Sequence, residues 1–294
     1  MSFLGKLKQL FASKPKSSMK RVDLSKRFDL VNRTGQGSMS KVWKARDMEL
    51  GRIVCLKILD KVKTATFEAR FPGAKKPPEG EICVSLRHPN IVRTLEYGIS
   101  FQGDPFLVME LIDGDGLNLL VETHSSRLDS NRINYLSQVA DALEYVHSQG
   151  YLHRDICPRN VMVDRENVVK LIDFGLTIPN KPEFLRPGNR TGTTSYLAPE
   201  LIRRVATDKR VDLFALGVTA WEVFAHNLPW EKAASLQTLL NHMNSPPRNP
   251  RELNPNLDDA MVQFLLKSVA RDPADRFQTA ADFREALQRL PKQY

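Results

Sequence analysis

An ordered series of polar motifs between residues 150 and 200 restricts the fold more than any other feature of the chain. His-Arg-Asp at 153–155 comes directly after segment 129–150, which has the apolar spacing of one helix face and ends at a glycine. Asn160 follows five residues after the aspartate, Asp-Phe-Gly occupies 173–175, and Ala-Pro-Glu occupies 198–200. Any one of these triplets could arise by chance, whereas the ordered set is highly specific.

Length and composition exclude several classes of protein. The 294 residues are 41% hydrophobic and 26% charged, which is ordinary globular usage rather than that of a disordered or collagen-like chain. A chain of this length buries a large core and favours two lobes over one. No apolar run approaches the ~20 residues that span a bilayer, which excludes an integral membrane protein.

The charge balance favours anionic partners. The chain has 43 Lys and Arg against 34 Asp and Glu, a net charge of +9, which suits nucleotide phosphates, acidic lipids, nucleic acid or acidic proteins, or simply keeps the protein in solution. No interleaving of aromatic and basic residues appears, so we expect no nucleic-acid partner. Cys55, Cys83 and Cys157 are too widely spaced for a disulfide framework or a zinc site, which predicts a reducing, cytoplasmic location.

Residues 1–26 differ from the rest and are expected to form a basic amphipathic tail and linker. On a helix, apolar residues of segment 3–12 fall within a stripe of ~120°, with Lys6 and Lys8 on its two sides. This pattern predicts a helix on an anionic membrane surface, at the inner membrane face. A frayed tail and a helix docked on the protein's own surface are equally compatible. Segment 13–22 is polar and basic and suits a flexible linker. The apolar stripe of segment 3–12 consists of Phe3, Leu4, Leu7, Leu10 and Phe11.

A glycine-containing loop and a strand lysine follow the tail. Thr34-Gly35-Gln36-Gly37 lies between two expected strands, and glycines let backbone N–H groups approach phosphate oxygens. An ordinary hairpin turn gives the same pattern.

Lys57 stands in the middle of the apolar segment 53–59. It either points to solvent from an edge strand or is a cation aimed at phosphates and held by a carboxylate, because an unpaired lysine is costly to bury. Candidate partners are Glu79 and Glu81, at the start of a short helix expected over 77–86.

Together these motifs resemble the eukaryotic-type (Hanks-type) serine/threonine protein kinase family over residues 28–290. Further matches are Gly192-Thr193 through Glu200, Asp212 through Gly217, and Arg271 through Phe277. The resemblance implies an α+β, bilobal fold. We expect a small antiparallel-sheet lobe with one helix at 27–110 and a larger, mostly helical lobe at 111–294, forming a single kinase domain at 27–290. The composition and the Leu-Pro-Trp run at 228–230 favour a bacterial member.

The resemblance implies roles in phosphoryl transfer from ATP with Mg²⁺. Lys57 would hold the α- and β-phosphates and pair with Glu79, with Glu81 as the second candidate. Asp155 would accept or orient the proton of the substrate hydroxyl. Asn160 and Asp173 would bind the metal.

The remaining resemblances concern the adenine ring and the support of the loops. Segment 109–112 looks like the hinge between the lobes, with Met109 as gatekeeper. The backbone of Glu110 and Ile112 would bind the adenine edge. The ring would lie between Val42, Cys55 and Met162. The structural members would be the Glu200–Arg276 ion pair, Asp212 beneath the catalytic loop, and His153 packed in the core.

Two positions depart from the family pattern. Ser40 replaces a glycine of the loop, which should cost little. Cys157 stands where serine/threonine kinases usually have a lysine that neutralises the transferring phosphoryl group. A unit charge at ~4 Å contributes roughly 4 kcal/mol at an effective dielectric of ~20. Our hypothesis is that Arg159 supplies the missing charge; the alternatives are that it points to solvent or contacts the substrate.

The substrate class is expected to be protein Ser/Thr hydroxyls, since Gly192-Thr193 matches the serine/threonine version of the peptide-receiving segment, with Thr193 bonded to Asp155. Arg154 offers a cation for a phosphate on the segment 173–200. Thr191, Thr194 and Ser195 are candidate acceptors, whereas the usual primary position falls near Asn189.

The leading hypothesis is therefore an ATP- and Mg²⁺-dependent protein kinase. The alternative is a weakly active, pseudokinase-like module recruited to membranes, which Cys157 favours and the retained Lys57, Asp155, Asn160 and Asp173 oppose. A kinase for small molecules is disfavoured by the peptide-receiving segment.

Overall fold

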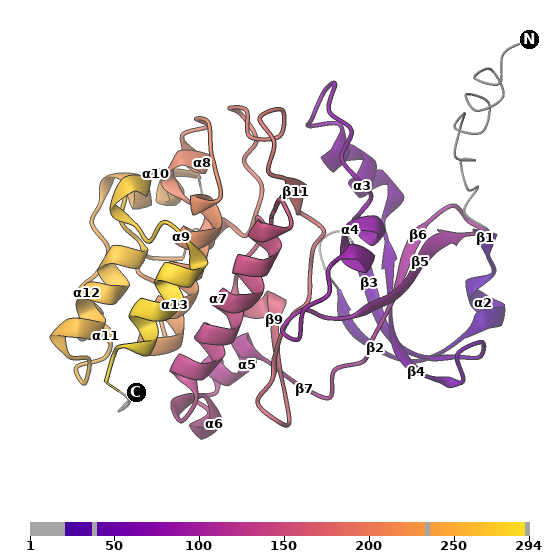
Figure 1. Cartoon of the computed structure of the whole chain (residues 1–294), viewed down its shortest axis with the longest axis horizontal. Helices are drawn as coiled ribbons and strands as arrows, with labels where there is room; N and C mark the ends of the chain where they lie inside the picture. The colour runs from indigo at the N-terminus through magenta and orange to yellow at the C-terminus, as the bar shows by residue number, and fades with distance from the viewer. Residues whose placement is uncertain (1–20, 37–39, 233–235, 292–294) are drawn as a thin grey trace, which may run out of the picture.

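The computed structural model describes residues 21–36, 40–232 and 236–291, and these form two lobes (Figure 1). Segment 3–12, most of the expected linker, and Gly37 lie outside the described residues. The small lobe contains a six-stranded sheet with the strand order β1-β5-β6-β4-β3-β2. Its strands are β1 (Arg21–Val22), β2 (Phe28–Gln36), β3 (Ser40–Asp47), β4 (Arg52–Leu59), β5 (Thr94–Ser100) and β6 (Pro105–Met109).

The register of this sheet places Lys57 in its interior. On β4, Lys57 lies opposite Val42 of β3 and Leu107 of β6, so the solvent-facing edge strand considered for it is wrong. Cys55, on the same strand as Lys57, lies opposite Met109 of β6. Because alternate residues of a strand point to the same side, Cys55 lies on the same face of the sheet as Lys57. All strand pairs are antiparallel as expected, except that the two-residue β1 runs parallel to β5.

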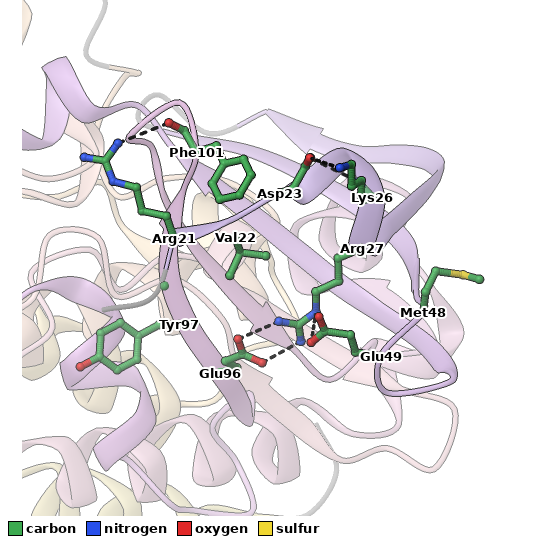
Figure 2. Close-up of a pocket in the computed structure, with 11 residues that line it drawn as sticks. Arg21, Val22, Asp23, Lys26, Arg27, Met48, Glu49, Glu96, Tyr97 and Phe101 are labelled. Atoms are coloured by element: carbon green, nitrogen blue, oxygen red, sulfur yellow. Dashed lines mark hydrogen bonds and ion pairs between the residues drawn. The ribbon is translucent and has the colours of Figure 1, made fainter. Parts of the chain in front are cut away.

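The small lobe begins earlier than the sequence indicated. Residues 21–26, expected to belong to the tail and linker, contribute to β1 and the short helix α2 (Leu24–Arg27). The cause is a buried charge cluster, because the Arg27 guanidinium lies 2.9 Å from an Asp47 oxygen and 2.7 Å from a Glu96 oxygen. Figure 2 shows Arg27 and Glu96 at a pocket of about 550 Å³ between β1, α2 and β5. None of the expected site residues lines this pocket.

The expectation of one helix in the small lobe is wrong, since α3 (Lys61–Glu68) precedes the expected helix, which is α4 (Glu79–Ser85). Helix α3 forms because the Asp60 carboxylate caps the N–H groups of Val62 and Lys63, and because Phe67 is buried. The weak apolar periodicity of this segment gave no signal for a helix.

The larger lobe is mostly helical, as expected. Its long α7 occupies the amphipathic segment, but it begins at Arg132 because residues 126–129 form a separate helix. Helix α7 packs against both α9 and α13 (Figure 1). The helices are α5 (Leu117–Glu122), α6 (Ser126–Asp129), α7 (Arg132–Ser148), α8 (Pro199–Ile202), α9 (Arg210–Ala225), α10 (Leu236–Asn244), α11 (Pro250–Leu253), α12 (Asp259–Ser268) and α13 (Ala280–Gln288).

Short strands in the larger lobe present the polar motifs. One sheet has the order β10-β9-β7, and a second pairs β11 with β8. The loop between β8 and β9 carries residues 153–160, and the segment after β10 carries Asp173. These strands are β7 (Gly114–Gly116), β8 (Tyr151–Leu152), β9 (Val161–Asp164), β10 (Val169–Leu171) and β11 (Ile178–Pro179).

One apolar cluster joins the lobes. It includes Ile82 of α4 and Met109 of β6 together with the buried faces of α7 and α9. A smaller cluster around Phe28, Val54 and Phe106 fills the other face of the six-stranded sheet. Within the described residues, none of the helices combines the length and the apolar character needed to cross a bilayer.

Candidate active site

The buried carboxylate of Asp212 supports the loop at 153–160, which we call the catalytic loop. This carboxylate accepts hydrogen bonds from the backbone N–H groups of His153 and Arg154, both at 2.8 Å, and lies 2.9 Å from Nε2 of His147. Arg154 has a φ of 71°, a strained value for a non-glycine residue that surrounding contacts must stabilise. Although burial alone would raise the pKa of Asp212, the hydrogen bond with His147 holds it below its ordinary value. The structure thus gives Asp212 the bracing position that the resemblance implied.

Lys57 lies between two carboxylates. Its Nζ is 2.6 Å from Oε1 of Glu79 and 2.9 Å from Oδ1 of Asp173, and its side chain is only 6% exposed. Burial alone would lower the pKa of Lys57, but Asp173 and Glu79 raise it above its ordinary value. The lysine is therefore a fixed cation. Of the two candidate partners, Glu79 makes the ion pair, while Glu81 is exposed.

Asp155 is fully engaged by its neighbours. Its Oδ1 accepts hydrogen bonds from the backbone N–H of Thr193 at 2.8 Å and from the Thr193 hydroxyl at 2.7 Å. Its Oδ2 accepts one from Nδ2 of Asn160 at 2.8 Å. These bonds fix the carboxylate between the catalytic loop and the activation segment, residues 173–200.

The oxygens of Asn160 and Asp173 suit a hard cation. Nδ2 of Asn160 is used by Asp155, and Oδ1 of Asp173 accepts hydrogen bonds from Lys57 and Gly175. Oδ1 of Asn160 and Oδ2 of Asp173 accept no hydrogen bond from the described residues. Burial alone would raise the pKa of Asp173, but Lys57 lowers it below the ordinary value. The described residues contain no cluster of three or more His, Cys, Asp or Glu that would hold a metal ion alone.

Two of the expected adenine-binding residues, Val42 and Cys55, lie on the same face of the sheet as Lys57. Half-buried Val42 and Cys55 come from the sheet, and half-buried Met162 comes from β9. The Glu110 N–H donates to the carbonyl of Arg93, and the described residues do not use the Glu110 carbonyl or the Ile112 N–H in hydrogen bonds. Burial raises the pKa of Cys55 to about 11, so its thiol is a neutral part of this surface.

The loop before β3 is described only in part. The backbone at Thr34, Gly35 and Gln36 belongs to β2, with Gly35 opposite Val42 and a register shift just before it. Ser40, which replaces a glycine of the family pattern, opens β3 and is buried, with 8% of its surface exposed.

Cys157 and Arg159 occupy contrasting environments. Cys157 is buried, its Sγ lies 3.9 Å from the Thr193 hydroxyl, and burial raises its pKa to about 12. Arg159 is exposed and makes no ion pair with any described residue. Burial raises the pKa of Glu222, and the nearby positive charge of Arg159 partly offsets that rise. The Tyr196 hydroxyl donates a hydrogen bond to Glu222, so Arg159 stands beside a carboxylate that is already engaged.

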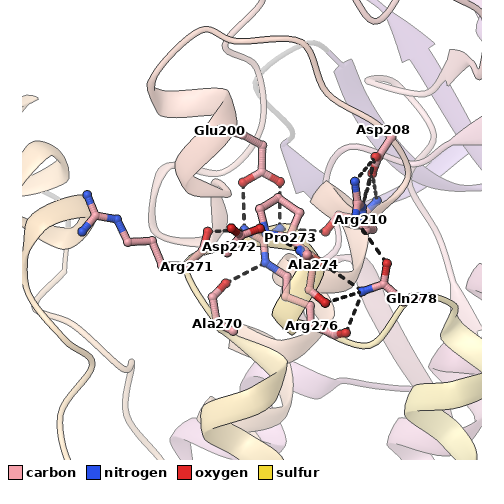
Figure 3. Close-up of polar contacts among 10 residues, drawn as sticks. All are labelled: Glu200, Asp208, Arg210, Ala270, Arg271, Asp272, Pro273, Ala274, Arg276 and Gln278. Carbon is pink, nitrogen blue, oxygen red and sulfur yellow. Dashed lines mark hydrogen bonds and ion pairs between the residues drawn. The ribbon is translucent and has the colours of Figure 1, made fainter.

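A buried ion pair anchors the end of the activation segment (Figure 3). The Arg276 guanidinium lies 2.7 and 2.8 Å from the two oxygens of Glu200 and also donates to three backbone carbonyls. Its side chain is fully buried. This geometry matches the structural role that the resemblance implied for the pair.

Sequence reasoning missed Glu222. It is a lone acidic residue within the apolar run of α9, and that isolation was the available signal. His153, by contrast, packs against Phe174 in the core with 0% exposure, as expected.

Comparisons with known proteins agree with this geometry. The family model for the protein kinase domain matches residues 28–289. A serine/threonine-protein kinase PknB of Mycobacterium leprae is 31% identical over 274 residues, which cover 91% of this chain and 43% of that protein. The serine/threonine-protein kinase pkn3 of Myxococcus xanthus is 30% identical over 276 residues, covering 88% of this chain and 49% of that protein. A probable serine/threonine-protein kinase of Clostridium perfringens is 31% identical over 271 residues, which cover 92% of this chain and 39% of that protein.

The chain thus matches less than half the length of each of these bacterial relatives. The family match covers nearly all of the described residues and both lobes. By sequence and by fold, the chain belongs to the protein kinase family.

Proposed function

We propose that the chain is an ATP-dependent protein kinase that transfers the γ-phosphoryl group of Mg-ATP to Ser or Thr hydroxyls of protein substrates. The observation that carries this proposal is the convergence of Lys57, Glu79 and Asp173 in one ion-paired group, close to an Asp155 held by Asn160 and Thr193. Phosphoryl transfer depends mainly on positioning and on neutralisation of charge, and this group supplies both.

In this proposal Lys57 binds the α- and β-phosphates. Its ammonium group is fixed by Glu79, so it need not be ordered when the nucleotide arrives. When bound, Mg²⁺ neutralises phosphate charge, and Asn160 and Asp173 would hold it through the oxygens that make no hydrogen bond with the described residues. Val42, Cys55 and Met162 would pack on the adenine ring, and the backbone of Glu110 and Ile112 would bind its edge.

Asp155 orients the acceptor hydroxyl and accepts its proton. Thr193 fixes the carboxylate through two hydrogen bonds, and this contact between the catalytic loop and the peptide-receiving segment supports an aliphatic Ser or Thr acceptor. The similar bacterial proteins are serine/threonine-protein kinases by name, which supports the same substrate class. We retain Arg159 as the proposed substitute for the lysine that Cys157 replaces. The assembled site gives no support to a catalytically silent interaction module.

Two further proposals concern location. A cytoplasmic location follows from the sparse cysteines, which are all free. Contact of segment 3–12 with an anionic membrane surface at its cytoplasmic side rests on the sequence pattern alone.

Phosphosite mapping by mass spectrometry after incubation with Mg-ATP and a mixed protein substrate tests the function. We expect new phosphoserine and phosphothreonine with the wild type and at least a hundredfold less with Asp155→Asn, since general-base positioning contributes about 10²–10⁴ in rate. Equal phosphate incorporation by the two proteins would refute the proposal. Phosphotyrosine alone would refute the substrate class.

A further inference from the structure

Three phenylalanine rings form a continuous contact from the activation segment to the small lobe. Phe184 packs against Phe71 with ring centroids 5.3 Å apart, and Phe71 meets Phe67 of α3 edge-to-face at 5.5 Å. Each of the three residues is at most 5% exposed. Aromatic pairs of this kind stabilise beyond the burial of their area. The activation segment is therefore fixed to the small lobe by apolar contact.

The chain leads directly from these rings to Glu79. Phe71 precedes Glu79 by eight residues. Between them, Nζ of buried Lys76 lies 5.5 Å from the centroid of Phe67, and two prolines at 77–78 stiffen the backbone before α4 begins. A shift of the rings is thus transmitted to the start of α4.

Helix α4 has little stability of its own. It is seven residues long, contains Gly80 and has no side-chain cap at its start. Helices of this length depend on tertiary contacts. Gly80 lies against β5, where an added Cβ would be 2.5 Å from Cβ of Tyr97. Ile82 and Cys83 are buried in the apolar cluster that also contains the three rings.

Charged contacts do not hold the activation segment at Arg154. The guanidinium of this buried arginine donates to the backbone carbonyl of Asn189 at 3.1 Å and to the Thr191 hydroxyl at 3.2 Å. It makes no ion pair with the described residues. Both acceptors are neutral groups of the activation segment.

From these contacts we propose that Phe184 and Phe71 are positioning residues that act through Glu79. Their contact holds α4 so that Glu79 meets Lys57. This inference deepens the proposed function and rests on it. Neither ring is placed against the nucleotide or the substrate.

A double-mutant cycle tests the proposal. Phe184→Leu keeps the site apolar but removes the ring contact, and it is made with Glu79 intact and with Glu79→Gln. Binding of Mg²⁺ with a fluorescent ATP analogue and kcat/KM for ATP are both measured. Intact mass confirms that every sample carries no phosphate. With Glu79 intact we expect about a tenfold loss in affinity and in kcat/KM, within the usual coupling of contacting networks. In the Glu79→Gln background we expect Phe184→Leu to change affinity and kcat/KM less than twofold.

The matched control is Phe283→Leu in α13, another buried phenylalanine with ring contacts at 4.9 and 5.5 Å but in the larger lobe. Its effect should be the same with Glu79 intact and with Glu79→Gln. Phe71→Leu should reproduce Phe184→Leu, and the two should not add. Equal effects of Phe184→Leu in both backgrounds would overturn the inference, even if the wild type phosphorylates protein. Failure of the wild type to bind the nucleotide would overturn the proposed function as well.

Discussion

Replacing Arg276 with methionine removes one partner of the buried ion pair with Glu200 while keeping much of the side-chain volume. Five hydrogen bonds are lost, two to Glu200 and three to the carbonyls of Ala270, Arg271 and Arg210. The Glu200 carboxylate is left buried without its cation. Removal of one member of such a pair costs about 3–5 kcal/mol, mainly because the remaining charge is uncompensated.

This cost can be expressed as a melting temperature. Unfolding entropy of about 2.1 cal/mol/K per residue gives roughly 0.6 kcal/mol/K for a chain of 294 residues. Arg276→Met should therefore lower Tm by about 5–8 °C in differential scanning calorimetry. Arg276→Lys should have an intermediate effect, since lysine restores the charge but not the paired geometry.

The neighbouring arginine is the matched control. Arg210 contacts Asp208 at 2.7 Å, but these side chains are 29% and 46% exposed (Figure 3). Exposed pairs contribute about 0–1 kcal/mol, so Arg210→Met should lower Tm by less than about 2 °C. If both methionine variants lowered Tm equally, the argument that burial gives the Arg276 pair its importance would be wrong.

Three other predictions address the site. Arg159→Ala should reduce kcat far more than the affinity for ATP, and unchanged turnover would eliminate its proposed role in charge compensation. Because burial raises the pKa of Cys157 to about 12, its thiol should react with iodoacetamide at pH 8 much more slowly than after unfolding; equal rates measured by peptide mass spectrometry would contradict this. The pKa of Asp212 is lowered in the folded state, so its contribution to stability is present above the ordinary carboxyl pKa of about 4 and is lost as pH falls through the folded value. Asp212→Asn should flatten the fall in Tm between pH 5 and pH 3, and an unchanged slope would argue against that contribution.

The ordered motifs allowed much of the fold and the site to be predicted. Polar residues in fixed order after an amphipathic helix specify a loop between short strands, and a lysine in an apolar strand requires a carboxylate partner. The family resemblance implied Glu79 as the partner of Lys57, with Glu81 as the second candidate, and the structure pairs Glu79 with Lys57. These features depend on local pattern or on one strong pairwise requirement.

Features that depend on tertiary contacts were missed. The short β1 and α2 are stabilised by the cluster of Arg27, Asp47 and Glu96, whose members lie up to 69 residues apart. Phe184 lies in a turn of the activation segment, where a single aromatic residue has no periodicity to reveal its partner. Such positions become interpretable only once the packing is known.

The charges of the site indicate where substitution of the usual lysine matters most. Lys57 contributes one positive formal charge, whereas Glu79, Asp173 and Asp155 contribute three negative ones. The group thus has a formal charge of −2 before any nucleotide binds, and the phosphates of ATP add further negative charge. Cys157, a buried neutral thiol, offers no compensation. In the proposed function, bound Mg²⁺ and cations of the catalytic loop would neutralise this charge. Arg159 is an exposed cation on that loop. Replacing Arg159 is therefore the most direct way to measure how its charge compensates for the missing lysine.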